Sequence, residues 1–179
     1  MTSTAPFDLL RGIEVRSQNK ALGLPQQIEV RRTWSGIGYR MGDFLLVSPM
    51  GDVSELLDYP TLTRVPGSKS WLKGIANVRG MLLPVVDLNS FITGTKIELQ
   101  KRSRVLVIHV GELSCGLVID EVLGLRHFFE EEKADYQHQD NDIKKFLVGG
   151  YKQGDMDWGV FSFKKLAEHP RFMEVAARK

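Results

Sequence analysis

The sequence predicts a mainly β fold, built as one or two small antiparallel barrels. From Trp34 onward, short apolar stretches are punctuated by glycines and two-residue turns, as is typical of this class. Turn residues, rather than helical segments of ten residues or more, separate most of these stretches, which argues against βαβ units and a parallel sheet. The 179-residue chain is 42% hydrophobic and 26% charged, and its length suits one domain or two small ones that share a core.

The first 32 residues are expected to form a helix and a polar linker. The helix would span residues 4–22, with Thr4 as its cap, Pro6 in its first turn and Gly23 after its end. Its apolar side is short and decays into polar sequence. We therefore expect this helix to lean on the domain or on a partner rather than to form the core.

Three strands are expected next. Two of them lie within "WSGIGYRMGDFLLVSPM" (34–50) and are joined by a two-residue turn at Gly42–Asp43. The third lies in "GDVSELLDY" (51–59). A loop rich in proline, threonine and serine follows, and it leads to a short turn at "WLKG" (71–74).

A hairpin is predicted in "IANVRGMLLPVVDL" (75–88), where an arginine and a glycine separate two apolar stretches. Arg79 and Gly80 would lie at the hairpin end, with Gly80 supplying the positive φ that a tight turn needs. The buried apolar stretches have no packing use for a guanidinium between them. Arg79 is therefore expected to project from the barrel.

The second half predicts two further hairpins and a broken terminal helix. The clearer hairpin spans residues 105–119 and turns at Gly111–Glu112. The later one spans residues 146–163 and turns near Gly154–Asp155, and the helical segment after it is broken at Pro170. No internal repeat or low-complexity segment is apparent.

Motifs for enzymatic chemistry are absent from the sequence. There is no P-loop, HExxH or GxSxG pattern, and the four histidines are scattered. The single cysteine, Cys115, excludes an internal disulfide or a multi-cysteine metal site, and its apolar surroundings predict a small buried hydrophobe. We therefore expect no catalysis, metal or cofactor.

Asp87 raises one enzymatic alternative, a receiver-type phosphoacceptor, because it closes an apolar strand. Such a site needs further acidic residues to hold magnesium, together with alternating helices, and neither is visible. Pro84 also disrupts a central parallel strand. The favoured interpretation is that Asp87 caps the short turn "DLNSF".

A nucleic-acid-binding barrel is a second alternative, because basic residues cluster at two places in the sequence. The net charge of +2 is too balanced to imply this function. Only two aromatic residues accompany the clusters, whereas a stacking platform usually needs more. The basic residues are Arg31, Arg32, Arg102 and Arg104, and the aromatic residues are Trp34 and Tyr39.

A cytoplasmic location is expected. The N-terminus lacks a positively charged segment followed by an apolar core, as a signal peptide would have. No apolar run approaches the ~20 residues that a membrane span needs.

Four segments, in order along the chain, resemble the CheW-like domain family of bacterial chemosensory arrays. "WLKGIANVRGMLLPVVDL" (71–88) is similar to the family signature, in which Asn-x-Arg-Gly precedes an apolar strand that ends in Pro-x-x-Asp-Leu. "GDVSELLD" (51–58), "CGLVIDEVLGL" (115–125) and "FLVGGYKQGDMDWGVFSFKKL" (146–166) resemble further segments. The resemblance covers about residues 33–168.

The resemblance implies two packed five-stranded SH3-like barrels, without catalysis or a cofactor. Residues 1–32 would precede the domain, residues 33–168 would form its two sub-barrels with a division near residue 100, and residues 169–179 would form a C-terminal helix or tail. The family couples the cytoplasmic tip of a methyl-accepting chemoreceptor to a CheA-type histidine kinase, through that kinase's own CheW-like domain. The N-terminal extension and "PGSKSWLKGIANVRG" (66–80) resemble most the adaptors of type IV pilus twitching motility. A flagellar chemotaxis adaptor is the alternative.

Partner binding is the role that the resemblance implies for a set of residues around Arg79. The matching arginine of the family is a signalling residue close to the glutamate that matches Glu55. An exposed ion pair contributes only about 0–1 kcal/mol to stability, whereas an interface arginine contributes about 2 kcal/mol or more to binding. We therefore expect Glu55 to orient Arg79 for a partner. The full predicted set is Val53, Glu55, Gly74, Ile75, Asn77, Arg79, Gly80 and Val85 on one side, and Val118, Val122 and Leu123 on a facing wall. For each of the valines, the isoleucine and the leucine, packing in the core is the alternative.

Overall fold

The computed structural model describes residues 11, 33–136 and 141–174. Apart from Arg11, the expected N-terminal helix lies outside this part, as do the last five residues of the expected C-terminal helix. Contacts divide the chain into residues 1–31 and residues 32–179, and the fold below belongs to the second unit.

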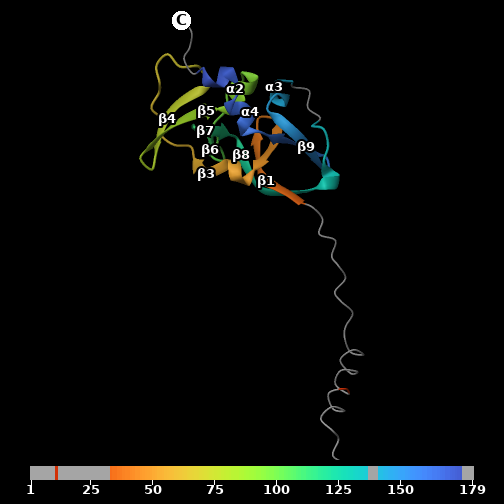
Figure 1. Cartoon of the computed structure of the whole chain (residues 1–179). Coiled ribbons are helices and arrows are strands. Elements are labelled where there is room, and N and C mark those ends of the chain that lie inside the picture. The colour runs from red at the N-terminus through yellow and green to blue at the C-terminus, as the bar shows by residue number, and fades with distance from the viewer. Residues whose placement is uncertain (1–10, 12–32, 137–140, 175–179) are drawn as a thin grey trace, which may run out of the picture. The chain divides into compact units, whose positions relative to one another are not determined.

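Ten strands and several short helices make up the described fold (Figure 1). The strands are β1 (Thr33–Met41), β2 (Phe44–Pro49), β3 (Val53–Asp58), β4 (Leu72–Val78), β5 (Met81–Asp87), β6 (Arg104–Val110), β7 (Leu113–Ile119), β8 (Glu121–Phe129), β9 (Leu147–Gln153) and β10 (Met156–Phe161). The helices are η1 (Met50–Asp52), α2 (Leu88–Thr93), η2 (Glu130–Glu132), α3 (Asn141–Lys144), α4 (Phe163–Ala167) and α5 (Pro170–Met173).

The strands form two five-stranded sheets, which confirms the predicted mainly β fold. One sheet has the order β8-β1-β2-β10-β9 and the other β3-β6-β7-β5-β4. The four expected hairpins are present, and each turns at its predicted two-residue position. Two pairings are parallel, β2 with β10 and β5 with β7.

The chain is a structural repeat whose two halves exchange hairpins. Strands β1–β5 and β6–β10 follow the same sequence of elements, a hairpin, an edge strand and a second hairpin. Each sheet combines the first hairpin of one half with the edge strand and second hairpin of the other half. Residue 100 therefore falls between the two halves of the chain, but it does not separate the two sheets.

The pairing registers of the two halves match as well. Edge strand β3 pairs with β6, and edge strand β8 pairs with β1. Each edge strand carries a one-residue bulge, and the two bulges lie at the same distance from the β6–β7 turn and the β1–β2 turn. Bulges also fall at matching positions in the second hairpins, opposite β5 and β10. The matching pairs across the edge strands are Val53–Ile108 and Glu55–Val107 in one sheet, and Val122–Tyr39 and Gly124–Gly38 in the other.

Three apolar clusters form the core, one between the sheets and one inside each sheet. The largest lies between the sheets and includes Phe91 and Phe161. Trp158 belongs to the cluster inside the first sheet, and Val105 to the one inside the second. The strands near the centre of each sheet are therefore buried on both faces, which explains their nearly continuous apolar sequences.

Asp87 caps helix α2, as predicted. Its carboxylate accepts the backbone N–H of Ser90 at 2.9 Å and that of Ile97 at 3.1 Å, and its side chain is fully buried. At the equivalent place after β10, the hydroxyl of Ser162 accepts the N–H of Lys165 and caps α4. In Figure 1, α4 is labelled just below α2. A buried carboxylate with both oxygens engaged has no access to a phosphodonor, so the geometry argues against the phosphoacceptor alternative.

Candidate functional site

The β4–β5 turn is the most unusual backbone feature of the described residues. Arg79 has a φ of 51° and Gly80 a φ of 86°, and Arg79 is the one non-glycine residue with positive φ in the described part of the chain. A type I′ turn requires positive φ at both central residues, and a side chain there costs about 1–2 kcal/mol. The side-chain oxygen of Asn77 accepts the N–H of Gly80 at 2.9 Å and closes the turn. The first turn positions of the other three hairpins are glycines, Gly42, Gly111 and Gly154.

Arg79 forms the predicted ion pair with Glu55. Its Nη2 donates to Oε1 of Glu55 at 2.6 Å. The arginine side chain is 77% exposed and the glutamate side chain 26% exposed. The guanidinium therefore keeps most of its donors toward solvent, while the carboxylate fixes its direction.

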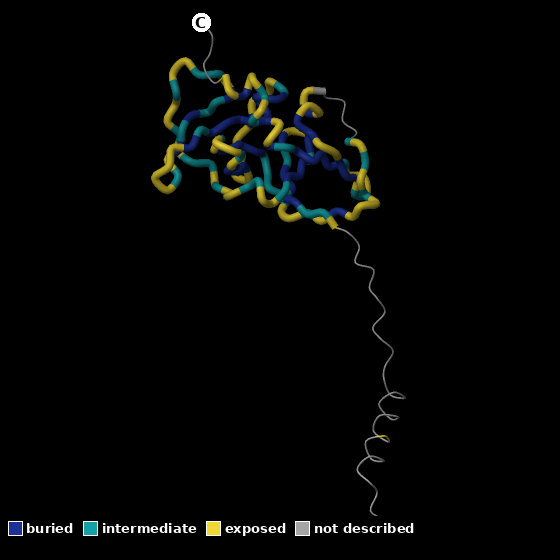
Figure 2. The backbone as a smooth tube through the Cα atoms, in the orientation of Figure 1, coloured by how far each residue is buried: buried dark blue, intermediate teal, exposed yellow. Residues whose placement is uncertain are grey.

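Apolar side chains that follow the residues of this pair in the sequence are exposed, although the sequence analysis expected the apolar stretches beside Arg79 to be buried. Met81 and Leu82 are exposed immediately after the turn, and Leu56 is exposed one residue after Glu55 on β3. Figure 2 shows buried backbone in the interior of the fold and exposed segments mainly at its periphery. Strand alternation was the available signal, because Leu83 is buried and its neighbour Leu82 must then face the other way. The turn therefore combines an exposed cation with an exposed apolar rim.

Of the other residues in the predicted set, Val53 begins β3, Ile75 and Asn77 lie on β4, and Gly80 lies in the β4–β5 turn. Val53 and Ile75 are half-buried, whereas Asn77 and Gly80 are exposed.

Three residues of the predicted set are structural instead. Val85 and Val118 are fully buried in the cluster inside the second sheet, so their prediction as surface residues is wrong. Gly74 is buried, and a Cβ there would approach the carbonyl oxygen of Thr63 to 2.5 Å. Glycine at 74 therefore permits the backbone contact of β4 with the loop after β3.

Val122 and Leu123 are half-buried on β8, which belongs to the other sheet from Arg79. Val122 packs against the cluster between the sheets, and Leu123 against the one inside the first sheet. Val122 occupies the position equivalent to Val53, since each valine pairs with the matching residue of a first hairpin. The two valines thus flank the shared core from equivalent places.

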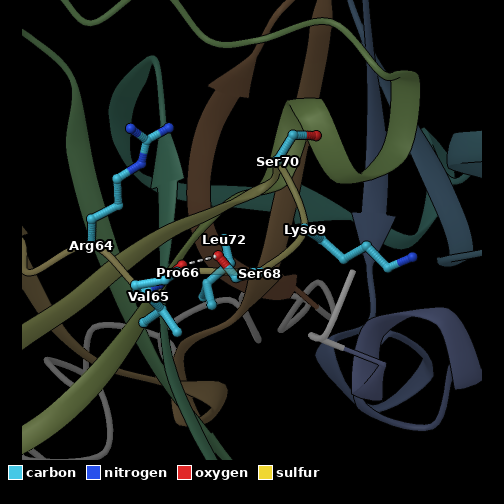
Figure 3. A pocket seen from close by; sticks show the side chains of 8 residues that line it. Arg64, Val65, Pro66, Ser68, Lys69, Ser70 and Leu72 are labelled. Carbon is cyan, nitrogen blue, oxygen red and sulfur yellow. Dashed lines mark hydrogen bonds between the residues drawn. The ribbon is translucent and has the colours of Figure 1, made fainter. Parts of the chain in front are cut away.

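Two cavities of the described residues differ in size and lining. The larger one, of about 360 Å³, lies in the loop of residues 64–72, where Arg64 and Lys69 point in different directions (Figure 3). A smaller apolar cavity of about 180 Å³ includes Cys115, and burial raises the pKa of this thiol to about 12, far from a reactive thiolate. Within the described residues, no group of three His, Cys, Asp or Glu side chains is placed to hold a metal ion.

The geometry does not favour the nucleic-acid alternative either. Arg104 pairs with Asp58 at 3.3 Å, and Arg102 lies 3.9 Å from Glu121. Tyr39 is fully buried and offers no stacking face. Arg31 and Arg32 lie outside the described residues.

No helix in the described part of the chain is long and apolar enough to cross a membrane.

Comparisons with known proteins identify the family. A model of the CheW-like domain matches residues 35–170. Over 176 residues the chain is 43% identical to the protein PilI of Pseudomonas aeruginosa, with 96% of each chain covered. It is 38% identical over 88 residues to the protein FrzA of Myxococcus xanthus, which covers 49% of this chain and 55% of FrzA.

A solved structure agrees with the fold. The scaffolding protein TtCheW from Thermoanaerobacter tengcongensis superposes with a TM-score of 0.68 at 21% identity, covering 78% of this chain and 96% of TtCheW. The two five-stranded sheets, the extent of the family match and the similarity to PilI lead to one conclusion: the chain belongs to the CheW-like domain family.

Proposed function

We propose that this protein is a non-catalytic adaptor that couples a methyl-accepting chemoreceptor to a CheA-type histidine kinase in type IV pilus twitching-motility signalling. It would bind the kinase through the kinase's CheW-like domain and the receptor through its cytoplasmic tip. A cytoplasmic protein would thereby be recruited to a membrane-associated array. Membership of the CheW-like family and the 43% identity to PilI over nearly the whole chain support this proposal.

The observation that carries the proposal is the exposed left-handed conformation of Arg79. A strained residue persists only where the surrounding structure holds it, and such residues are concentrated at functional sites. Asn77 and Glu55 supply that support here, through the turn hydrogen bond and the ion pair. An exposed ion pair is worth about 0–1 kcal/mol, which does not repay the strain of about 1–2 kcal/mol. Partner binding is the role that accounts for keeping an arginine in this conformation.

The apolar surroundings of Arg79 fit a protein partner. Val53 precedes Glu55 on β3 and Ile75 precedes Arg79 on β4, both half-buried, and Leu82 is exposed past the turn. A helical receptor tip could bury these side chains in a helix-in-groove arrangement, with Val122 and Leu123 contributing from the other sheet. Individual interfaces of this kind are modest, and array multivalency would strengthen them.

Binding measurements with purified components test the proposal. The components are the CheA-type kinase and a chemoreceptor cytoplasmic fragment from the same organism, each titrated with the wild-type protein and with Arg79→Glu. We expect the variant to bind at least one of them about tenfold or more weakly, with unchanged circular dichroism and melting temperature. Lys152→Glu is a matched control, because Lys152 is an exposed cation on the hairpin of the other sheet. If the wild-type protein failed to bind the kinase, or failed to bind the receptor fragment, the proposed coupling of the two would be contradicted.

The pathway is tested separately in cells. Deleting the gene is expected to abolish twitching and to leave swimming intact, and the wild-type gene should restore twitching. The reverse phenotype, loss of swimming with twitching intact, would support the flagellar alternative.

A further inference from the structure

Arg126 is a half-buried cation of the first sheet whose guanidinium has no acceptor. It lies on β8, opposite Gly36 of β1. Within residues 33–136 and 141–174, no carboxylate or carbonyl accepts a hydrogen bond from it, and its Nε is buried. The burial is confined to the Nε side of the group, so the terminal nitrogens reach solvent. Buried donors in native proteins nearly always have an acceptor, which makes this arginine an exception.

The ring of Trp158 holds the guanidinium in place. The guanidinium carbon lies 5.0 Å from the centre of this ring, in a cation–π contact. Trp158 is fully buried, and among the described residues its indole N–H has no acceptor either. Gly38 of β1 makes room for both side chains, since a Cβ there would come within 2.8 Å of Cγ of Arg126 and 3.0 Å of Cζ3 of Trp158. Packing therefore fixes the arginine, while its N–H groups stay unsatisfied.

The second sheet shows that the fold does not need a cation at this place. The pairing registers make Leu57 the equivalent of Arg126 and Leu83 the equivalent of Trp158. Leu83 is buried, and Leu57 packs against the cluster inside the second sheet. Val107 stands at the position of Gly38. One sheet thus fills this place with apolar side chains, and the other keeps a charged group there.

Acidic residues close to Arg126 in the sequence or next to Trp158 do not neutralise it. Asp157 neighbours Trp158 on β10 and therefore points to the opposite face of that strand. Three glutamates of β8 and η2 have other partners, which are Arg40 for Glu121, Lys133 for Glu130 and the backbone N–H of Phe129 for Glu132. Within the described residues, Arg126 forms no ion pair.

We propose that Arg126 binds a carboxylate of an acidic protein segment, at a site in the other sheet from Arg79. The terminal nitrogens of an arginine present N–H groups in a fork that a carboxylate accepts in a bidentate manner. Space for a partner's side chain lies next to Gly124, which is exposed two residues before Arg126, and a Cβ at this glycine would meet nothing within 4 Å. One unneutralised cation matches a singly charged carboxylate better than a doubly charged phosphate. This inference does not depend on the proposed function.

Nuclear magnetic resonance of the full-length protein tests the proposal at the site itself. The signals are those of the Arg126 Nε–H and of the Trp158 indole N–H. The probe is a hexaglutamate peptide, and hexaglutamine is the neutral control. We expect both signals to shift saturably with hexaglutamate, with a dissociation constant of about 1 mM or below, and not to shift with hexaglutamine.

Substitutions at Arg126 separate binding from structure, with the Trp158 indole signal as the readout. Arg126→Gln should weaken hexaglutamate binding about tenfold or more. Arg64→Gln is the matched control, because Arg64 is an exposed arginine of the loop before β4, and it should leave the affinity within about twofold. Arg126→Leu introduces the residue that the second sheet has at this position, so it should also weaken binding while the melting temperature stays at or above the wild-type value.

Several outcomes would overturn the inference. These are the lack of a saturable shift with hexaglutamate, an unchanged affinity in Arg126→Gln, and binding of inorganic phosphate that is equal to or tighter than that of the peptide. A fall of about 10 °C or more in the melting temperature of both Arg126 variants would show a structural role instead. The kinase and receptor titrations are unaffected by these results, so the proposed function is tested separately.

Discussion

Arg79 and Glu55 come from opposite edges of one five-stranded sheet, yet their side chains meet at 2.6 Å. The sheet order places β3 at one edge and the β4–β5 hairpin at the other, so the sheet must curl for this contact to form. In the other sheet the matching edges meet through a neutral contact, in which the Gln153 side chain donates to the carbonyl of His127 at 3.3 Å. A curled sheet of this topology therefore does not need the charged pair.

Replacing Arg79 with glycine is expected to leave the melting temperature within about 4 °C of the wild type. Relief of the left-handed conformation stabilises by about 1–2 kcal/mol, whereas loss of the ion pair and the greater freedom of glycine in the unfolded chain together cost a similar amount. Thermal unfolding monitored by circular dichroism checks this. The control is Gly80→Ala, which should lower the melting temperature because alanine would be forced to a φ of 86° while Arg79 remains. A fall of about 10 °C in the Arg79→Gly variant would instead show that the pair holds the fold together.

Replacing Asp87 with alanine is expected to destabilise the fold by about 2–3 kcal/mol. The change leaves the buried backbone N–H groups of Ser90 and Ile97 without an acceptor and removes the cap of α2. Denaturant unfolding measures the difference. Ser162→Ala, the equivalent cap of α4, is the matched comparison and should cost about 1 kcal/mol, since its side chain is less buried. Equal and negligible effects of the two changes would contradict the capping role.

Because Val118 is buried and Leu82 is exposed, truncating them is expected to change the free energy of unfolding by very different amounts. Val118→Ala should cost about 2 kcal/mol, because it leaves a cavity inside the second sheet. Leu82→Ser removes a larger apolar side chain but should change the free energy of unfolding by less than about 0.5 kcal/mol, since that side chain is exposed. If Leu82→Ser proved the more destabilising of the two in urea, the assignment of core and surface on this sheet would be incorrect.

The stability of the fold is expected to fall on acidification through a contribution from His169. Its imidazole packs against Phe91 and Phe146, and this burial, together with nearby Arg171 and Lys145, lowers its pKa from the usual value. The unfolded chain therefore binds the proton at higher pH than the folded chain does. The free energy of unfolding carries no penalty from His169 above about pH 6.5, and it falls as the pH drops below this value.

Comparing the wild type with His169→Gln by urea unfolding between pH 7.5 and 5 isolates the contribution of His169. The stability difference between the two proteins should shift in favour of the variant as the pH falls. A difference that stays constant with pH would exclude the effect.

Local sequence patterns predict the hairpins but not the way in which they assemble. The turn residues at Gly42, Gly111 and Gly154 determine where the chain reverses, and these reversals depend on neighbouring residues alone. The exchange of hairpins between the halves depends on packing between distant segments. The two halves share turn and bulge positions rather than a run of similar residues, so no repeat is visible in the sequence.

The same distinction explains the partial success at the candidate site. Arg79 and Glu55 could be predicted, because a cation between two apolar stretches is conspicuous and the family resemblance supplied its partner. Val85 and Val118 could not be assigned correctly, because β5 and β7 are buried on both faces and their apolar runs do not tell which face a residue occupies.

The central claim is that Arg79 serves binding rather than folding, and isothermal titration of the chemoreceptor fragment and of the CheA-type kinase tests it most directly. For Arg79→Glu, with Lys152→Glu as the control, we predict at least one dissociation constant about tenfold or more above the wild-type value and melting temperatures within about 4 °C of it. Unchanged dissociation constants for both partners, or weaker binding that merely parallels a loss of thermal stability, would contradict the claim.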